Sequence, residues 1–501
     1  MLPRPPSLRA SRRLRLPARP ASRITGARRA LIGGGLAVVA VALLLGGAAL
    51  VLRGSVDYAL LSAAGAACLL VLLAVPALKP DYDVVEPLSF VLLAVAVGVT
   101  LKPAYILFGP EANADYLLLN RQEPAFLVTA VVFMLVGLGS LCAGYLLPLS
   151  GLRLGRSRLL GWPVWSRPKL LLVSALGIVV ALAAMYLYVD RLGVTGILQD
   201  FSRKRFLTVE GAEYGRSALG YYRWAASVTA PIFLFFFAWA LGKQGKIGAV
   251  EVVVLGGLLL LSVVFPFFNS SRTKVLIVLI EALVVWKCVR GRIPRWATYG
   301  IGVGMLALLV LLSLVRNRSA DLSSFDSRTG VQTLLESTVG GRHFLDLTKT
   351  AHIIEGVPEK VDYMYGETYV SWAFMPIPRT VWLDKPPLGA GPIIGSEIFD
   401  LRSAGVPPGM IAEAYLNFGV LGILFVPFLL GAGMRWCYES FRPVLANPAG
   451  AAAYATAVIP IGLTTVTSGF SQMVIVLLIS VAPVLVVAAL VRARRPRAHA
   501  L

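Results

Sequence analysis

Apolar residues along this chain gather in long uninterrupted blocks, and polar residues fall in the short gaps between them. Blocks of about 20 residues match the length of a helix that crosses ~30 Å of hydrocarbon. Because a backbone inside lipid must satisfy its own hydrogen bonds, each block is predicted to be a helix. We predict twelve spans, at residues 30–52, 57–78, 84–101, 124–147, 169–189, 222–241, 248–268, 275–289, 297–315, 409–435, 449–466 and 472–491.

This pattern predicts an all-α fold, a polytopic transmembrane helix bundle with one large loop. Residues 30–315 hold the first nine spans and residues 409–491 hold the last three. The segment between them, 316–408, is too long to be a simple tether. Its 331–354 stretch carries apolar residues at helical spacing, so we expect short helices that lie along the membrane surface in this loop.

Composition agrees with a membrane protein. The chain is 57% hydrophobic and only 15% charged, with a mean hydropathy of +0.76. Soluble domains are about 45–50% apolar and about 25% charged. The net charge of +21 would suit a nucleic-acid binder if the basic residues formed one patch. They are instead spread over short loops and tails, so no nucleic-acid partner is expected.

The placement of charge predicts the orientation. If the N-terminus is inside and twelve spans alternate, the cytoplasmic segments hold 27 of the 47 Lys and Arg residues but only five acids. The external segments hold 20 bases and 20 acids. This is the positive-inside pattern. We therefore predict two basic cytoplasmic tails: residues 1–29, which lack apolar periodicity and are expected to be disordered, and residues 492–501.

Cysteine and histidine usage indicates no metal centre. None of the four cysteines falls in a predicted external loop, which excludes an external disulfide on this topology. The chain has no CxxC or HExxH pair and only three histidines. We expect no metal and no other cofactor.

Basic residues on the predicted external side suggest an anionic ligand. Arg203, Arg205, Lys274, Arg342 and Arg379 lie in these loops. The planar guanidinium fork binds phosphate oxygens two at a time, so several arginines at one membrane face suit a diphosphate headgroup. The alternative for each is to anchor a helix end or to pair with an external acid.

Arg272 is the exception among these bases. It lies in the six-residue turn Asn269–Lys274, which contains no acid to pair with it. A functional role is therefore favoured for Arg272 over a purely structural one.

Glu413 stands one turn into the tenth apolar block, with Asn417 four residues later on the same helical face. An acid within lipid is costly and usually marks a cavity or a partner. The alternative is a buried hydrogen bond between helices. We favour function because Glu413 lies at the external end of its block.

Three stretches in this order resemble the bacterial oligosaccharide repeat-unit polymerases, the Wzy-type O-antigen polymerases. They are Tyr365–Tyr369 (YGETY), Pro376–Pro387 (PIPRTVWLDKPP) and Glu413–Gly419 (EAYLNFG), which opens a span after a long external loop. Arg272, at the start of a predicted helix after a small-residue turn, is also similar to that family.

The resemblance implies a metal-independent glycosyltransferase of the bacterial inner (cytoplasmic) membrane. Donor and acceptor would both be oligosaccharides on undecaprenyl diphosphate, and membrane lipids, a chain-length regulator or a flippase would be its other partners. Displacement at an anomeric carbon needs cations for the leaving diphosphate and a base for the acceptor hydroxyl. The catalytic candidates are Glu413, Arg272 and Arg379, with Glu367 and His343 as alternative bases. The substrate-binding candidates are Arg203, Arg205, Lys274, Arg342, His343, Glu367, Tyr369, Lys385, Tyr415 and Asn417.

Three other functions compete with this one. An O-antigen ligase-like transferase or a cell-division-type glycan polymerase would be an enzyme of the same chemical kind. A polyprenyl-phosphate sugar transferase would need an acidic metal site in its first external loop, which here is only Arg53–Val56 followed by Asp57. A transporter or flippase of lipid-linked sugars predicts two related halves and short external loops, which the 316–408 segment contradicts.

Overall fold

The computed structural model describes the chain from residue 26 to residue 493 with several gaps. The described ranges are 26–54, 56–102, 124–152, 165–192, 225–243, 247–268, 272–294, 347–377, 381–401 and 405–493, with a few isolated positions between them. Over these residues the structure is helical and holds no strand. The all-α class predicted from the sequence is confirmed for this part of the chain.

Nine helices among the described residues are long and apolar enough to cross a membrane, which makes this a multi-pass membrane protein. The first helix begins at Gly26, so residues 26–29, predicted to belong to the disordered tail, are helical; residues 1–25 lie outside the described residues. The helices are α1 (Gly26–Arg53), α2 (Val56–Leu78), α6 (Pro124–Tyr145), α7 (Arg167–Leu192), α10 (Thr229–Gly242), α11 (Ala249–Phe268), α18 (Gly409–Phe441), α19 (Pro448–Ile459, continued through a π-turn and α20 to Thr467) and α21 (Phe470–Val491).

Three of the twelve predicted spans are not among these nine. The 84–101 block forms the short helix α3 (Pro87–Val95) and a π-turn (Ala96–Leu101). The 275–289 block lies in α12 (Arg272–Arg290), which carries five charged residues. The 297–315 block lies outside the described residues except at two single positions. The count of twelve therefore stays a prediction.

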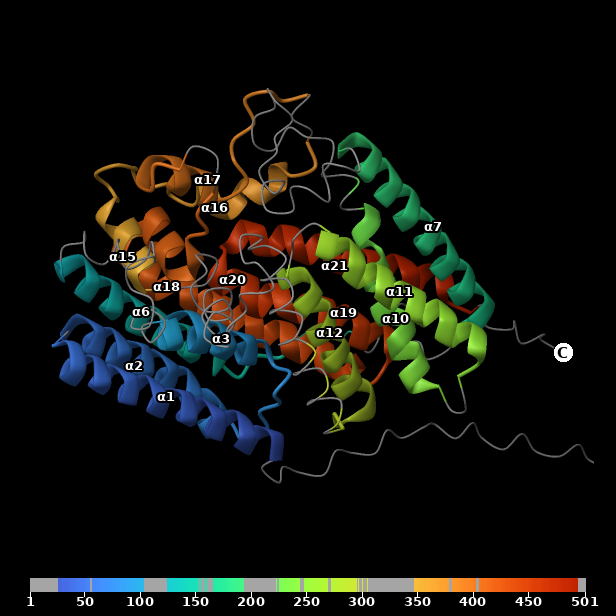
Figure 1. Cartoon of the computed structure of the whole chain (residues 1–501), viewed down its shortest axis with the longest axis horizontal. Helices are drawn as coiled ribbons and strands as arrows, with labels where there is room; N and C mark the ends of the chain where they lie inside the picture. The colour runs from blue at the N-terminus through green and yellow to red at the C-terminus, as the bar shows by residue number, and fades with distance from the viewer. Residues whose placement is uncertain are drawn as a thin grey trace, which may run out of the picture.

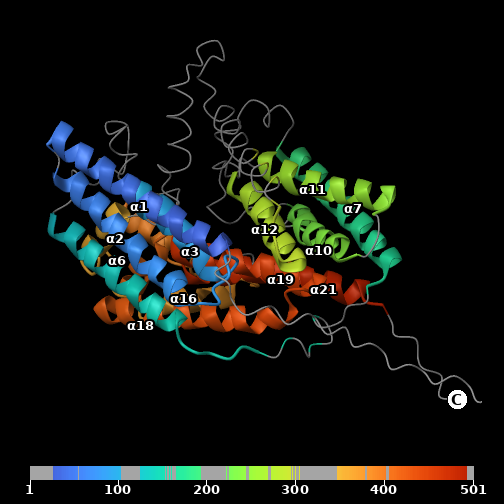
Figure 2. The same ribbon diagram turned by 90° about the horizontal axis from the view of Figure 1, so that it is seen from below.

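The long helices form two groups that meet along α3 and α19 (Figures 1 and 2). In Figure 2, α1, α2 and α6 lie apart from α7, α10, α11 and α12. Each group has its own buried apolar core, and α19 belongs to the core of the second. Every residue of α19 from Ala449 to Ile459 is buried. Its run of alanines explains this, because small side chains let neighbouring helices approach closely in a membrane.

Glycines set the close contact between α6 and α18. A Cβ at Gly431 would collide with the carbonyl oxygen of Leu141, and a Cβ at Gly144 would collide with that of Phe428. Each helix thus presents a glycine to the backbone of the other. The pair of contacts fixes the middle of α18 against the last turn of α6.

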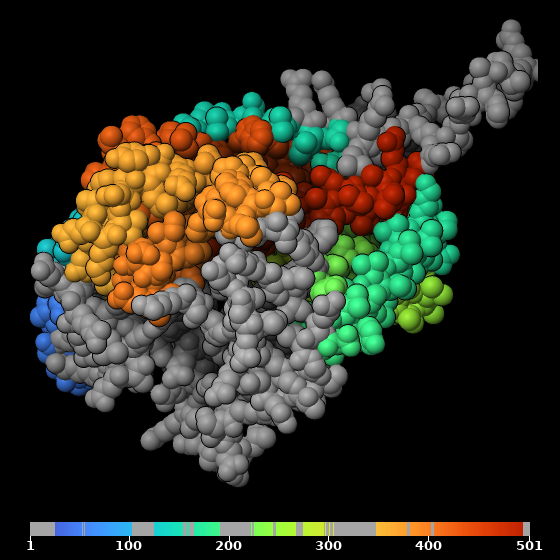
Figure 3. Space-filling view, turned by 90° about the horizontal axis from the view of Figure 1, so that it is seen from above, coloured from blue at the N-terminus to red at the C-terminus, as the bar shows by residue number. Residues whose placement is uncertain are grey.

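The predicted external loop forms short helices over one face of the molecule (Figure 3), where the yellow and orange segments of residues 347–401 gather. They are α15 (Leu347–Glu355), α16 (Glu367–Val370), a 3₁₀ turn (Ser371–Phe374), α17 (Gly391–Ile393) and a π-turn (Ile394–Ile398). α15 packs on the helix bundle: its Ala351 and Ile354 contact Ala130 of α6, and nearly all of its residues are buried. The expected position of these helices along the membrane surface stays a prediction.

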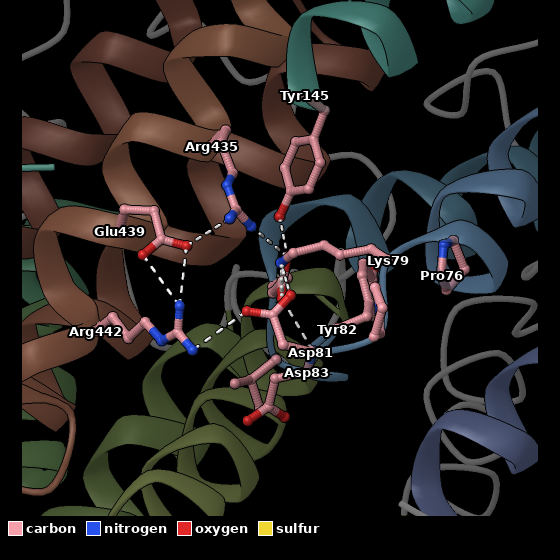
Figure 4. Close-up of polar contacts among 12 residues, drawn as sticks. Pro76, Lys79, Asp81, Tyr82, Asp83, Tyr145, Arg435, Glu439 and Arg442 are labelled. Atoms are coloured by element: carbon pink, nitrogen blue, oxygen red, sulfur yellow. Dashed lines mark hydrogen bonds and ion pairs between the residues drawn. The ribbon is translucent and has the colours of Figure 1, made fainter. Parts of the chain in front are cut away.

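An ionic cluster, buried at Lys79 and exposed at Asp81 and Arg442, links the α2–α3 turn to the last part of α18 (Figure 4). The buried Glu86 carboxylate accepts hydrogen bonds from Lys79 at 2.5 and 2.6 Å and from the Tyr145 hydroxyl at 2.6 Å. The surrounding ion pairs are Arg435–Glu86 (3.8 Å), Arg435–Glu439 (2.8 Å), Arg442–Glu439 (3.3 Å), Arg442–Asp81 (3.2 Å) and Lys287–Asp83 (3.7 Å). The four bases of the cluster are balanced by its four acids, so we assign the cluster a structural role.

This cluster and Glu413 lie at opposite ends of α18. Arg435 follows Glu413 by 22 positions, which corresponds to roughly 33 Å along a helix, about the thickness of the hydrocarbon layer. The backbone N–H of Leu152 donates to Ser440 at 2.7 Å, so the segment after α6 lies at the cluster's end of the bundle. The predicted alternation of spans also places these segments on one side.

Candidate functional site

Glu413 is buried where three segments of the chain meet. Its side chain on α18 is only 2% exposed. Oε1 accepts a hydrogen bond from the Thr368 hydroxyl of α16 at 3.1 Å, and Oε2 accepts one from the backbone N–H of Phe470, the first residue of α21, at 2.7 Å. An ionised carboxylate offers about four acceptor positions, so these two bonds leave capacity for a further donor.

Asn417 fixes the direction of the Thr368 hydroxyl. Its Nδ2 donates to Thr368 Oγ1 at 2.7 Å and to the Glu413 carbonyl oxygen at 2.8 Å, while its Oδ1 accepts from the Gly366 N–H at 3.0 Å. Since Thr368 Oγ1 already accepts from Asn417, its own proton is free to point at Glu413. The three side chains therefore form one directed chain of hydrogen bonds.

A break in α18 explains why the 364–366 segment docks here. Gly419 takes the backbone angles φ 59° and ψ −145° inside the helix. The break removes the helical N–H partners of the carbonyl groups just before it. Two of these carbonyls, of Leu416 and Asn417, instead accept from the N–H groups of Met364 (3.0 Å) and Tyr365 (3.1 Å).

Hydroxyl groups extend the network towards α21 and the loop after α16. Ser471 of α21 donates to the Thr368 carbonyl oxygen and lies 3.1 Å from the Ser371 hydroxyl. Ser371 in turn accepts the Gly389 N–H at 2.9 Å. These bonds fix the loop, α16 and the start of α21 relative to Glu413.

Gly469 brings the start of α21 close to the Glu413 carboxylate. Its φ is +137°, and a Cβ there would lie 3.1 Å from both carboxylate oxygens. A negative charge at a helix N-terminus is stabilised by the exposed N–H groups and the helix dipole. Glu413 therefore caps α21 from a neighbouring helix.

Tyr369 covers this site with its ring and offers an unused donor. The ring stacks on Phe418 (centroids 6.0 Å apart, planes at 7°) and lies 5.4 Å from that of Phe470. Its hydroxyl oxygen is buried and has no hydrogen-bond partner among the described residues. Burial, and then the nearby Glu413 charge, raise the pKa of Tyr369 well above its ordinary value, so the phenol stays protonated.

Comparison with protein-family models, curated proteins and solved structures finds no match to this chain.

Of the predicted site residues, the structure brings Glu413, Asn417 and Tyr369 together. Tyr415 lies on the same turn of α18, but its hydroxyl meets that of Tyr363 at 3.5 Å and its ring packs on Phe133. Glu367 is exposed on α16. Neither Tyr415 nor Glu367 has a hydrogen bond to Glu413 among the contacts of the described residues.

The structure describes the side chains of only two of the predicted basic residues, Lys385 and Lys274. Lys385 is 7% exposed and donates to the carbonyl oxygens of Met375 (3.4 Å) and Ile377 (2.8 Å), which closes the loop that contains them. Lys274 is exposed in the first turn of α12, and only the backbone of Arg272 is described, as the first residue of that helix. The remaining five candidates lie outside the described residues: Arg203, Arg205, Arg342, His343 and Arg379.

Sequence reasoning missed four residues that build the site: Thr368, Ser371, Gly469 and Ser471. A signal for two of them existed. The gap between the last two apolar blocks contains Ser468, Gly469 and Ser471, which is a typical helix-start composition. In the described part of the chain no group of three or more His, Cys, Asp or Glu side chains could hold a metal ion.

Proposed function

We propose that this chain is an integral-membrane glycosyltransferase that polymerises undecaprenyl-diphosphate-linked oligosaccharide repeat units into a surface polysaccharide, on the external face of the bacterial inner membrane. One observation carries the proposal. Two of the stretches that resemble the repeat-unit polymerases, Tyr365–Tyr369 and Glu413–Gly419, are bonded to each other around a buried carboxylate. Their convergence is what a shared site requires.

In the proposed reaction, an acceptor sugar hydroxyl attacks the anomeric carbon of the donor glycan. The bond from that carbon to the diphosphate oxygen breaks, and the diphosphate leaves on its lipid. Glu413 takes the proton of the attacking hydroxyl, for which its carboxylate has free acceptor capacity beside Thr368 and Phe470. Its 2% exposure means that the acceptor reaches it only after the Tyr369 cover moves.

Two further roles complete the proposal. The Tyr369 hydroxyl, protonated and without a partner among the described residues, donates to an oxygen of the bound sugar. A buried donor left without a partner in a native structure calls for such an acceptor. Arg272 and Arg379 hold the leaving diphosphate through bidentate contacts, as the resemblance implies.

Deletion of the gene tests the function in the cell. The expected result is that surface polysaccharide collapses to single repeat units, with the lipid-linked unit accumulating in the membrane. A wild-type copy restores the long polymer, whereas a Glu413→Gln copy expressed at the same amount does not.

The competing functions give other results in the same strain. Polymer that is still made but remains on its carrier lipid would indicate a ligase-like transferase. Accumulation of the lipid-linked unit on the cytoplasmic side only would indicate a flippase. Polysaccharide of unchanged length and amount would contradict all three.

A further inference from the structure

Four aromatic rings form a continuous row from α6 to the segment before α16. The ring of Phe133 on α6 lies 5.4 Å from that of Tyr415 on α18, measured between centroids. The Tyr415 ring lies 6.0 Å from that of Tyr363, which in turn lies 6.5 Å from the ring of Tyr365. The first three residues are partly buried, whereas Tyr365 at the end of the row is 81% exposed.

The backbone holds Tyr365 in place at the end of this row. Its N–H donates to the carbonyl oxygen of Asn417 at 3.1 Å, and the N–H of Gly366 donates to the Asn417 side chain at 3.0 Å. The φ angle of Tyr365 is +43°, a left-handed conformation that is costly for a residue with a large side chain. Glycine would adopt it at little cost. The fold alone therefore does not explain a tyrosine here, and such strain gathers at functional sites.

The segment after Tyr365 leads to the cover of Glu413. Gly366 lies against the ring of Phe418, because a Cβ on this glycine would be 3.2 Å from the Phe418 Cζ atom. Phe418 stacks on Tyr369, the residue that covers the Glu413 site. A ligand held at Tyr365 would therefore lie beside the aromatic residues through which Glu413 is reached.

Exposed carboxylates flank the two last tyrosines along the chain. Asp362 directly precedes Tyr363, and Glu367 follows Tyr365 by two positions; both acids are exposed. Aromatic faces next to carboxylates suit a sugar. The C–H groups on one face of a pyranose pack on the electron-rich face of an aromatic ring, and its hydroxyl groups donate to carboxylate oxygens. A lipid chain fits less well, because it would displace water from the nearby charges.

We propose that Tyr363 and Tyr365 form a stacking platform for a sugar ring of the oligosaccharide repeat unit, with Asp362 and Glu367 accepting hydrogen bonds from its hydroxyl groups. The identity of this ligand rests on the proposed function. The platform contacts the glycan away from the bond that reacts. Loss of a ring should therefore weaken binding and leave the chemical step unchanged.

Binding of a soluble glycan tests the platform without turnover. The probe is the single repeat-unit oligosaccharide obtained by partial hydrolysis of the cell's own surface polysaccharide, added to the full chain in lipid nanodiscs. Saturation-transfer NMR gives the Kd and shows which sugar protons contact the protein.

Tyr365→Leu removes the ring but keeps an apolar side chain without β-branching, so the backbone strain stays the same. Its Kd should rise roughly three- to tenfold, the effect of losing one ring contact. Tyr365→Trp should bind like the wild type, because it keeps an aromatic face. The control is Tyr186→Leu on α7, which removes another exposed tyrosine ring and should leave the Kd unchanged.

Two results would overturn the platform. One is an equal Kd for the wild type and Tyr365→Leu, which is expected if the ring only contacts lipid. The other is absence of saturation transfer to the sugar in the wild type.

Failure of the proposed function looks different. The wild-type chain would then bind the probe through Tyr365 but make no polymer from the lipid-linked unit. Where polymer is made, Tyr365→Leu should raise KM with kcat unchanged, whereas Glu413→Gln lowers kcat. A fall in kcat alone in Tyr365→Leu would contradict a binding role.

Discussion

Replacing Glu413 separates its capping of α21 from its proposed role as a base. In Glu413→Ala the N–H of Phe470 and the hydroxyl of Thr368 both lose their acceptor. A buried donor left without a partner costs about 1–3 kcal/mol, so the two cost about 2–6 kcal/mol together. In Glu413→Gln the amide oxygen can still accept from Phe470, and the amide N–H₂ can donate to Thr368, whose own proton then loses its acceptor. Charge assistance and this one acceptor are lost, which together cost roughly 1–3 kcal/mol.

Activity and stability should respond differently to the Gln and Ala substitutions of Glu413. A general base contributes about 10²–10⁴-fold to the rate. Glu413→Gln should therefore lose at least about a hundredfold in polymer formation while most of its stability remains. The assay is polymer formation per folded protein in purified membranes, together with the thermal unfolding midpoint of the purified chain. Glu413→Ala should lose both activity and a larger part of the unfolding midpoint.

Near-wild-type polymer from Glu413→Gln would refute the base. Glu413 would then only cap α21, and we would expect the yield of folded protein to fall in Glu413→Ala but not in Glu413→Gln. Equal loss of stability in both variants would contradict the assignment of the two hydrogen bonds.

Three further predictions follow from the same structure. Thr368→Val should lower kcat about tenfold and move its pH profile, because it removes one hydrogen bond of ~1.4 kcal/mol to Glu413, and Thr368→Ser should restore both. Gly431→Ala should destabilise the α6–α18 contact by about 1–3 kcal/mol in thermal unfolding, whereas Gly433→Ala, with open space around it, should not. Arg272→Lys should reduce turnover roughly ten- to a hundredfold, because a point charge cannot replace the bidentate fork; wild-type turnover would remove Arg272 from the site.

Helix positions were accessible from the sequence because the bilayer fixes their length. The predicted blocks 57–78 and 472–491 agree with α2 and α21 to within two residues. α18 runs six residues past its predicted end at 435, because polar residues there stay helical through ion pairs with the α2–α3 turn. The block at 84–101 becomes helical only at Pro87 and ends in a π-turn at Ala96–Leu101, which no apolar pattern reveals.

The site was only partly predictable. Glu413 and Asn417 share one face of one helix, so their spacing placed them together. Thr368 and Phe470 lie 45 and 57 residues from Glu413 along the chain, and such contacts leave no local periodicity. The break at Gly419 decides the docking of residues 364–366, yet a glycine within an apolar block also occurs in unbroken helices of this chain, as at Gly137 of α6.

Reconstitution with a defined substrate tests the proposed function most directly. The full chain, purified in vesicles, is incubated with the lipid-diphosphate-linked single repeat unit isolated from the deletion strain, in excess chelator. Our account predicts a ladder of products that differ by one repeat unit and remain lipid-linked, and no ladder from Glu413→Gln. Unchanged single units, or a ladder that the chelator abolishes and magnesium restores, would contradict the metal-independent polymerase.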